Sequence, residues 1–143
     1  MFRRSMSTVA VTASRCLLAA AVRGNATTPP TPGKVRVTFI VRDGSRKQVL
    51  APVGVSLMEA GVENGIDIEA ACDGTCACST CHCYLDDASF ARLPKATDDE
   101  LDMLDLAVAV KKTSRLACQV KLTQELDGAI TATLPAEVAN QLK

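Results

Sequence analysis

Five of the seven cysteines in this chain of 143 residues lie between residues 72 and 83, in C-D-G-T-C-A-C-S-T-C-H-C. Only one triplet in this segment has the spacing C-x5-C-x2-C, namely Cys72, Cys78 and Cys81. One more cysteine, Cys118, follows after an interval of 36 residues, in R-L-A-C-Q-V. The chain therefore has one loop dense in thiols and one distant thiol that the fold can bring to it.

Three clustered thiolates and one distant thiolate are a typical ligand set for a [2Fe–2S] cluster, in which a loop wraps one side and a strand supplies the last ligand. We therefore expect Cys72, Cys78, Cys81 and Cys118 to bind one such cluster. Between these ligands lie small residues, which let backbone N–H groups approach the sulfurs. They are Gly74, Thr75, Ala77, Ser79 and Thr80.

The remaining cysteines, Cys16, Cys76 and Cys83, are not expected to bind the cluster. Cys76 and Cys83 can each serve as a small buried hydrophobic residue. His82 is the only histidine. A Rieske centre needs two histidine ligands, so we expect His82 to be a structural side chain that hydrogen-bonds the loop backbone.

Two other functional classes are compatible with clustered cysteines. A zinc module could use four cysteines, but such modules usually pair two separate C-x2-4-C knuckles, and here Cys118 has no second cysteine beside it to form the other knuckle. A thiol–disulfide enzyme could use Cys78-Ser79-Thr80-Cys81, although that motif is expected at a helix start beside a βαβ unit. An electron-transfer protein is favoured over an enzyme, because the cluster itself would be the functional group. An absorption spectrum separates the three classes.

The motifs C-D-G-T-C-A-C-S-T-C-H and S-R-L-A-C-Q-V resemble those of the adrenodoxin-type, or mitochondrial, [2Fe–2S] ferredoxins. The stretch T-D-D-E-L-D-M-L-D-L between them is similar to the acidic helix of that family, and the resemblance covers roughly residues 34 to 136. It implies a one-electron carrier that accepts electrons from an NADPH-dependent ferredoxin reductase, a flavoprotein.

Two acceptors are compatible with the resemblance. Cys76 and the stretch L-T-Q-E-L-D-G after Cys118 resemble the branch that serves mitochondrial iron–sulfur cluster assembly. The alternative is electron donation to mitochondrial haem-thiolate monooxygenases, a branch that more often has an apolar residue at the position of Cys76. We expect no nucleic-acid partner and no membrane insertion.

The acidic stretch predicts a surface for protein partners. On a helix at 100° per residue, Asp98, Asp102 and Asp105 fall on one narrow stripe, and mostly apolar residues fill the opposite arc. A stripe of one charge sign can steer encounter with a basic partner, and in the resembling family this helix docks the reductase. The alternative is a solvated polar face with acids near a helix N-terminus.

Residues 1–33 carry four arginines and no acid, whereas the rest of the chain has 12 basic and 16 acidic residues, a net charge of −4. An Arg-rich, Ser/Thr-rich segment without acid is typical of a mitochondrial transit peptide, followed here by the linker 27–33. A secretory signal peptide is disfavoured, because Arg15 and Arg23 bracket its short apolar run. We expect import into the mitochondrial matrix and a ferredoxin domain over residues 34–143.

Periodicity and turn signals predict strands at 35–41, 47–53, 81–85, 115–122 and 130–134, and Asp43-Gly44 predicts a hairpin turn between the first two. Ser56-Leu57-Met58-Glu59 is a capping box that predicts a helix ending at Asn64-Gly65. A second capping box at residues 97–100 predicts a helix to about Val110. This order indicates an α+β chain, and the family resemblance implies a β-grasp mixed sheet with a packed helix, a cluster-binding loop and an acidic interaction helix.

Overall fold

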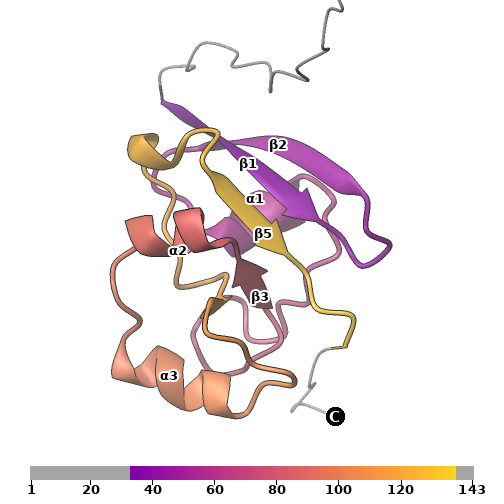
Figure 1. Cartoon of the computed structure of the whole chain (residues 1–143), viewed down its shortest axis with the longest axis vertical. Coiled ribbons are helices and arrows are strands. Elements are labelled where there is room, and N and C mark those ends of the chain that lie inside the picture. The colour runs from indigo at the N-terminus through magenta and orange to yellow at the C-terminus, as the bar shows by residue number, and fades with distance from the viewer. Residues whose placement is uncertain (1–32, 138–143) are drawn as a thin grey trace, which may run out of the picture.

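The computed structural model describes residues 33–137, and within them five strands form one mixed sheet (Figure 1). The elements are β1 (Lys34–Ile40), β2 (Arg46–Pro52), α1 (Leu57–Glu63), β3 (His82–Leu85), α2 (Asp87–Arg92), α3 (Asp98–Asp105), β4 (Ser114–Leu116), η1 (Gln124–Leu126) and β5 (Ile130–Thr133). The strand order is β2-β1-β5-β3-β4, with β1 and β5 parallel and the other pairs antiparallel. This confirms the predicted α+β class and β-grasp arrangement.

The β1–β2 hairpin forms one side of the sheet. Val35, Val37 and Phe39 alternate along β1 and are fully buried, as period-2 patterning requires of a strand with one face on the core. The hairpin turn contains Gly44 at φ +81°, a left-handed conformation that costs glycine little. The predicted hairpin is therefore present with the expected inward face.

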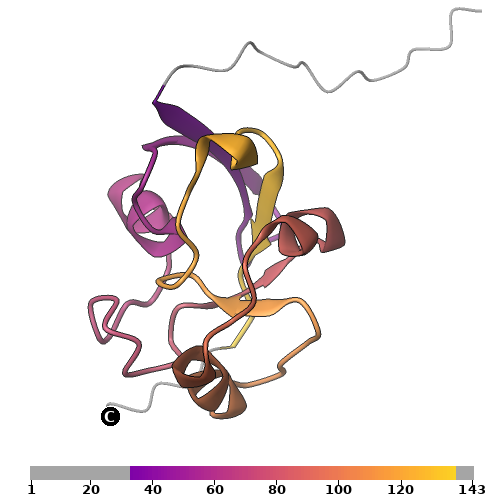
Figure 2. The same ribbon diagram turned by 90° about the vertical axis from the view of Figure 1, so that its left-hand side faces the viewer.

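Helix α1 begins and ends where the sequence predicts. The Glu59 backbone N–H donates to Ser56 Oγ (3.1 Å), and the Ser56 N–H donates to the Glu59 carboxylate (2.6 Å). The helix stops at Asn64, followed by Gly65 at φ +68°. Figure 2 shows α1 and α2 on opposite sides of the sheet.

Helix α3 is shorter than predicted. It starts after Thr97, whose Oγ1 accepts the Glu100 N–H at 3.3 Å, but it ends at Asp105 and not near Val110. The following segment is held out of a helix by tertiary contacts: the Tyr84 hydroxyl donates to the Ala109 carbonyl (2.8 Å), and Ala109 has φ +54°. The apolar face predicted for residues 103–110 is consequently buried mainly at Leu104.

The predicted strand at 115–122 is also shorter. Only Ser114–Leu116 pairs with β3, and the chain then turns, with the Gln119 N–H donating to the Leu116 carbonyl at 3.0 Å. A single bridge between Ser56 and Lys121 follows. The strand is interrupted at the turn that carries Cys118.

Two elements have no counterpart among the predictions. Helix α2 is fixed by the buried Ser89, whose hydroxyl donates to the Ala129 carbonyl (2.9 Å) and accepts the Thr131 N–H (3.0 Å). The 3-10 turn η1 precedes Asp127, whose carboxylate accepts the Arg36 N–H at 2.8 Å. Within residues 33–137 no helix has the length and apolar character needed to cross a bilayer. The predicted leader lies outside the described residues, apart from Gly33.

Candidate metal centre

The predicted ligand segment, residues 70–81, connects α1 to β3, and we call it the cluster loop. Strand pairing brings it to the distant cysteine. His82 pairs with Leu116 in the β3–β4 ladder, and the Ala117 N–H donates to the Cys81 carbonyl at 3.0 Å. Cys81 and Cys118 thus meet across the end of two antiparallel strands, although 36 residues separate them in the sequence.

The four predicted ligands lie in two pairs. The Cys72 and Cys78 side chains are hydrogen-bonded to each other, as are those of Cys81 and Cys118. Cys78, Cys81 and Cys118 are buried and Cys72 is partly exposed. Across residues 33–137 no three His, Cys, Asp or Glu side chains gather around one point where a single metal ion could bind. Two thiol pairs match a cluster of two irons that takes two protein thiolates at each iron.

Hydrogen bonds set the acidity of these thiols. At Cys118 the hydrogen bond from the Cys81 thiol is the main cause that lowers the pKa to about 6, and that bond together with burial raises the pKa of Cys81. Burial opposes ionisation at Cys72, but bonds from the Cys78 side chain and backbone N–H groups lower its pKa to about 7. Burial raises the pKa of Cys76 to about 11 and that of Cys83 to about 12.

The cluster loop turns its backbone N–H groups toward sulfur. Ala77 and Gly74 N–H groups donate to Cys72 Sγ, and the Cys76 N–H donates to Cys118 Sγ. These directions require left-handed backbone at Gly74 (φ +83°) and at Cys76 (φ +59°). Successive N–H groups in such turns form a concave site for an anion. Gly74 and Ala77 therefore have the role that the sequence predicts for the small residues of the loop.

Gly74 also permits close packing against the ligand region. A Cβ at this position would lie 3.3 Å from Met58 Cε and 3.7 Å from Cys118 Cβ. Because the position also has positive φ, a larger residue there would be strained and crowded. The loop is thus shaped to lie directly over α1 and Cys118.

Two hydroxyl groups beside the ligands bear on whether an anionic cluster fits. Thr80 Oγ1 accepts the Ala71 N–H (3.1 Å) and lies 3.1 Å from Cys78 Sγ, to which it can donate. Ser79 Oγ is buried and has no hydrogen-bond partner within the described residues. A buried hydroxyl without an acceptor is costly, and sulfur atoms of a cluster held by Cys78 and Cys81 would offer one. The hydroxyl donors of Ser79 and Thr80 therefore suit an anionic [2Fe–2S] cluster at these cysteines.

His82 and the two cysteines without predicted ligand roles have different environments. His82 is buried, and its Nε2 lies 2.7 Å from Ser114 Oγ, so its partner is a side chain and not the loop backbone that we expected. Burial and the nearby Lys111 lower its pKa. Cys83 is fully buried in β3, as a small hydrophobic residue would be, whereas Cys76 is partly exposed.

The three acidic residues of the predicted stripe, Asp98, Asp102 and Asp105, are all exposed on α3. Helix α3 and the cluster loop lie at the same end of the molecule, opposite the start of β1 (Figures 1 and 2). A hollow of about 220 Å³ separates them, lined by Thr75, Cys76, Asp99, Asp102 and Met103. Of the acidic stripe, as we call Asp98, Asp102 and Asp105, Asp102 therefore faces the cluster loop across this hollow.

Glu100 is on the buried side of the same helix, with 1% of its surface exposed. Its carboxylate accepts Arg115 Nε (2.7 Å) and Nη2 (2.9 Å) and the Leu116 N–H (2.9 Å). The remaining Arg115 nitrogen, Nη1, donates to the Pro94 carbonyl at 2.8 Å. This pair fastens α3 to β4, three residues before Cys118. It was not predicted, because an acid within a predicted helix does not reveal a partner in a distant strand.

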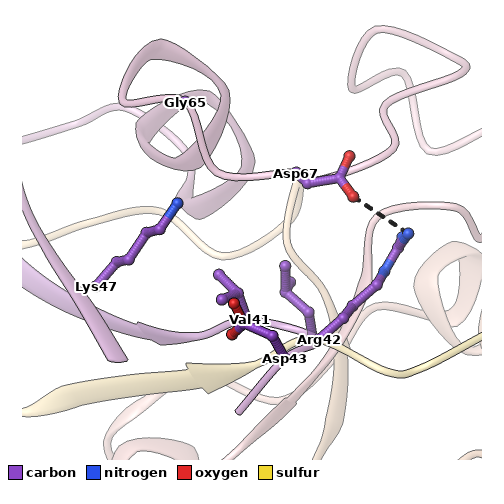
Figure 3. A pocket seen from close by; sticks show the side chains of 7 residues that line it. Val41, Arg42, Asp43, Lys47, Gly65 and Asp67 are labelled. Carbon is purple, nitrogen blue, oxygen red and sulfur yellow. Dashed lines mark ion pairs between the residues drawn. The ribbon is translucent and has the colours of Figure 1, made fainter. Parts of the chain in front are cut away.

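Another hollow, of about 260 Å³, lies where the β1–β2 turn faces the segment after α1 (Figure 3). Arg42 and Asp67 form an ion pair of 3.2 Å across it, and Lys47 and Asp43 also line it. The two acids and two bases are of balanced charge, and the Asp67 side chain is 79% exposed. No cysteine lines this hollow, and we assign no ligand to it.

Comparison with known proteins agrees with this geometry. Residues 40–123 match the family model described as a 2Fe-2S iron-sulfur cluster binding domain. A 2Fe-2S ferredoxin of Rickettsia rickettsii is 50% identical over 108 residues, which are 76% of this chain and 96% of that protein. The mitochondrial adrenodoxin homolog of Saccharomyces cerevisiae is 43% identical over 112 residues, 78% of this chain and 64% of that protein.

Among solved structures, a chain of the covalent putidaredoxin reductase–putidaredoxin complex superimposes with a TM-score of 0.68 and 41% identity. The match covers 71% of this chain and 99% of that one. At 41% identity, the two chains share sequence as well as fold.

Proposed function

The chain belongs to the adrenodoxin-type [2Fe–2S] ferredoxins, and on that basis we propose that it carries single electrons from an NADPH-dependent ferredoxin reductase to mitochondrial iron–sulfur cluster assembly. As a member of this family it carries electrons on one [2Fe–2S] cluster. The observation that supports the proposal most is the placement of four paired cysteines beside the exposed acidic stripe.

We assign Cys72, Cys78, Cys81 and Cys118 as the ligands, with Cys72 and Cys78 at one iron and Cys81 and Cys118 at the other. When bound, the cluster supplies a one-electron couple. The side chains already lie in those two pairs, and the loop N–H groups point at Cys72 and Cys118. These dipoles stabilise negative charge on sulfur, and the burial of Cys78 and Cys81 excludes water from the ligands.

The acidic stripe is proposed as the contact for a basic reductase. Exposed charges of one sign raise the encounter rate with a partner of opposite sign, and they leave the complex able to dissociate. Putidaredoxin, a relative with the same fold, has been solved in a covalent complex with putidaredoxin reductase. Glu100 has no such role, because it is buried against Arg115.

We expect the double substitution Asp102→Asn with Asp105→Asn to slow reductase-driven reduction on the order of tenfold at low salt, because long-range attraction is lost. The difference should shrink as added salt shortens the screening length to about 8 Å at physiological ionic strength. Stopped-flow absorbance of cluster reduction across a salt series measures both effects.

The matched control is Glu63→Gln with Glu125→Gln, which removes the same charge from exposed positions outside α3. It should keep more of the wild-type rate. If both double variants slow the reaction equally, net charge and not the acidic stripe governs encounter. If neither does, the stripe is only a solvated helix face.

The proposed electron acceptor, the iron–sulfur cluster assembly machinery, rests on Cys76 and the stretch L-T-Q-E-L-D-G, which resemble that branch of the family. Cys76 lies in the cluster loop, partly exposed and bordering the hollow next to α3, where a partner near the cluster would meet it. The test is to supply the reduced protein either with a purified iron–sulfur cluster assembly complex or with a mitochondrial haem-thiolate monooxygenase. Faster oxidation by the monooxygenase would replace the assembly role with the hydroxylation role.

Import into the mitochondrial matrix is the expected result of residues 1–33, which have four arginines and no acid. Fusing residues 1–33 to a fluorescent protein should send it to mitochondria and yield a shortened product. A variant with all four arginines changed to glutamine should remain in the cytosol. Cytosolic or secreted fluorescence from the unchanged leader would overturn the proposed location.

A further inference from the structure

Half-exposed apolar side chains are concentrated in α3 and the segment that follows it. Within residues 33–137, seven large hydrophobic side chains are exposed, and four of these lie between residues 101 and 110. These four, which we call the α3 apolar surface, are Leu101 (49% exposed), Leu106 (50%), Val108 (40%) and Val110 (48%). Single exposed apolar residues are ordinary, but several within ten residues of a charged surface suggest an interaction site.

Helical geometry places two of these side chains on either side of the stripe. At about 100° per residue, the stripe spans about 60°, from Asp105 through Asp98 to Asp102. Leu101 then lies about 40° beyond Asp105, and Leu106 about 40° beyond Asp102. A partner that covers the stripe must therefore also cover both leucines.

The exposure of these residues has a local structural cause. Leu104 already fills the space under α3 and is buried, while Glu100 occupies the next turn of the same inner face with its Arg115 pair. The segment after Asp105 leaves the helix and is fixed by the Tyr84 hydroxyl on the Ala109 carbonyl. Leu101 and Leu106 consequently remain outside the core although their neighbours are inside.

We propose that Leu101 and Leu106, the members of the α3 apolar surface that flank the stripe, are a second component of the reductase contact, so that the reductase presents basic residues to the stripe and apolar surface on either side of it. This inference rests on the proposed docking of the reductase at the acidic stripe. Charge attracts the partner from a distance, whereas burial of leucine surface acts only in contact and depends little on salt. The stripe governs the association rate, and the leucines govern how long the complex lasts.

The two components have different salt signatures, and this makes the proposal testable. The reductase of the same organism is titrated with cluster-loaded protein, and the Kd is measured from low to high salt. Leu101→Gln with Leu106→Gln should weaken binding about tenfold at every salt concentration, giving a parallel shift, because burying apolar surface is worth roughly 25 cal/mol per Å². Asp102→Asn with Asp105→Asn should instead flatten the salt dependence.

The matched control is Leu50→Gln with Val62→Gln, which changes two equally exposed apolar residues on β2 and α1 (50% and 49%). It should bind like the wild type, and all variants should retain the visible spectrum of the cluster. Equal weakening by the control would overturn the proposal. A wild-type Kd for the leucine variant at every salt concentration would also overturn the proposal. If the aspartate variant nevertheless loses its salt dependence, the reductase docks at the acidic stripe without an apolar component.

A second copy of the chain is the competing occupant of this surface. Sedimentation of the cluster-loaded wild type should give a monomer at the concentrations used for the titration. A dimer that the leucine variant converts to monomer would overturn the proposal, because the apolar surface would then be a contact between copies.

Discussion

A Cys118→Ser variant is expected to lose the cluster, so that iron falls from about two atoms per chain to nearly none. Serine keeps the size of the side chain, but its hydroxyl does not ionise to a soft anionic ligand as a thiol does. Cys118 is the partner of Cys81 and receives the Cys76 N–H, so its loss leaves one iron with a single thiolate. The same result is expected for Cys72, Cys78 and Cys81.

Cys76→Ser and Cys83→Ser provide the matched comparison. Cys83 Sγ faces the Arg115 carbonyl at 3.7 Å, and a serine hydroxyl can donate to the same oxygen, so β3 should tolerate the change. Both variants should hold about two irons per chain and show the wild-type visible spectrum. Each protein is reconstituted anaerobically, and iron and acid-labile sulfide are measured. A ligand variant with normal iron, or a colourless Cys76→Ser protein, would refute the assignment.

Glu100→Gln is expected to lower the free energy of unfolding by about 3 kcal/mol, one of the largest effects of any single substitution outside the ligands. The change leaves the Arg115 guanidinium, which is only 4% exposed, buried without its counter-charge. Removing one partner of a buried ion pair is costly, because the other charge has already left water. Loss of the ion pair should also weaken the attachment of α3 to β4.

Asp99→Asn, one residue away and exposed, is the control and should change stability by less than about 0.5 kcal/mol. Urea unfolding of the cluster-loaded proteins under anaerobic conditions, followed both by circular dichroism and by visible absorbance, gives the midpoints. A Glu100→Gln midpoint equal to that of Asp99→Asn would show that the pair contributes no net stability.

Local chemistry explains which parts of this molecule the sequence could predict. The ligand spacing, the Asp43-Gly44 turn and the Ser56 capping box each involve residues close in the chain, and a short-range rule is enough for each of them. The alternation along β1 likewise follows from one strand with one buried face. The turn, the capped helix and the strand were found where the sequence indicated.

The wrong boundaries arise where distant contacts outweigh local preference. Residues 106–110 have helix-compatible composition, yet the Tyr84 hydroxyl bond to the Ala109 carbonyl holds them in turns. Helix α2 depends on Ser89, whose hydroxyl accepts the N–H of Thr131 in β5, 42 residues away, and a helix of six residues carries little periodicity. The burial of Glu100 depends on Arg115 in the same way. Contacts between residues so far apart in sequence cannot be predicted from the pattern of a single helix.

The most direct test is whether one [2Fe–2S] cluster per chain takes up one electron. Reductive titration of the purified, cluster-loaded protein, followed by paramagnetic resonance and iron analysis, measures this directly. We predict one electron for every two irons at a midpoint potential of roughly a few hundred millivolts negative, because four thiolates leave the cluster anionic. A positive midpoint, or two electrons taken up per cluster at one potential, would contradict the account.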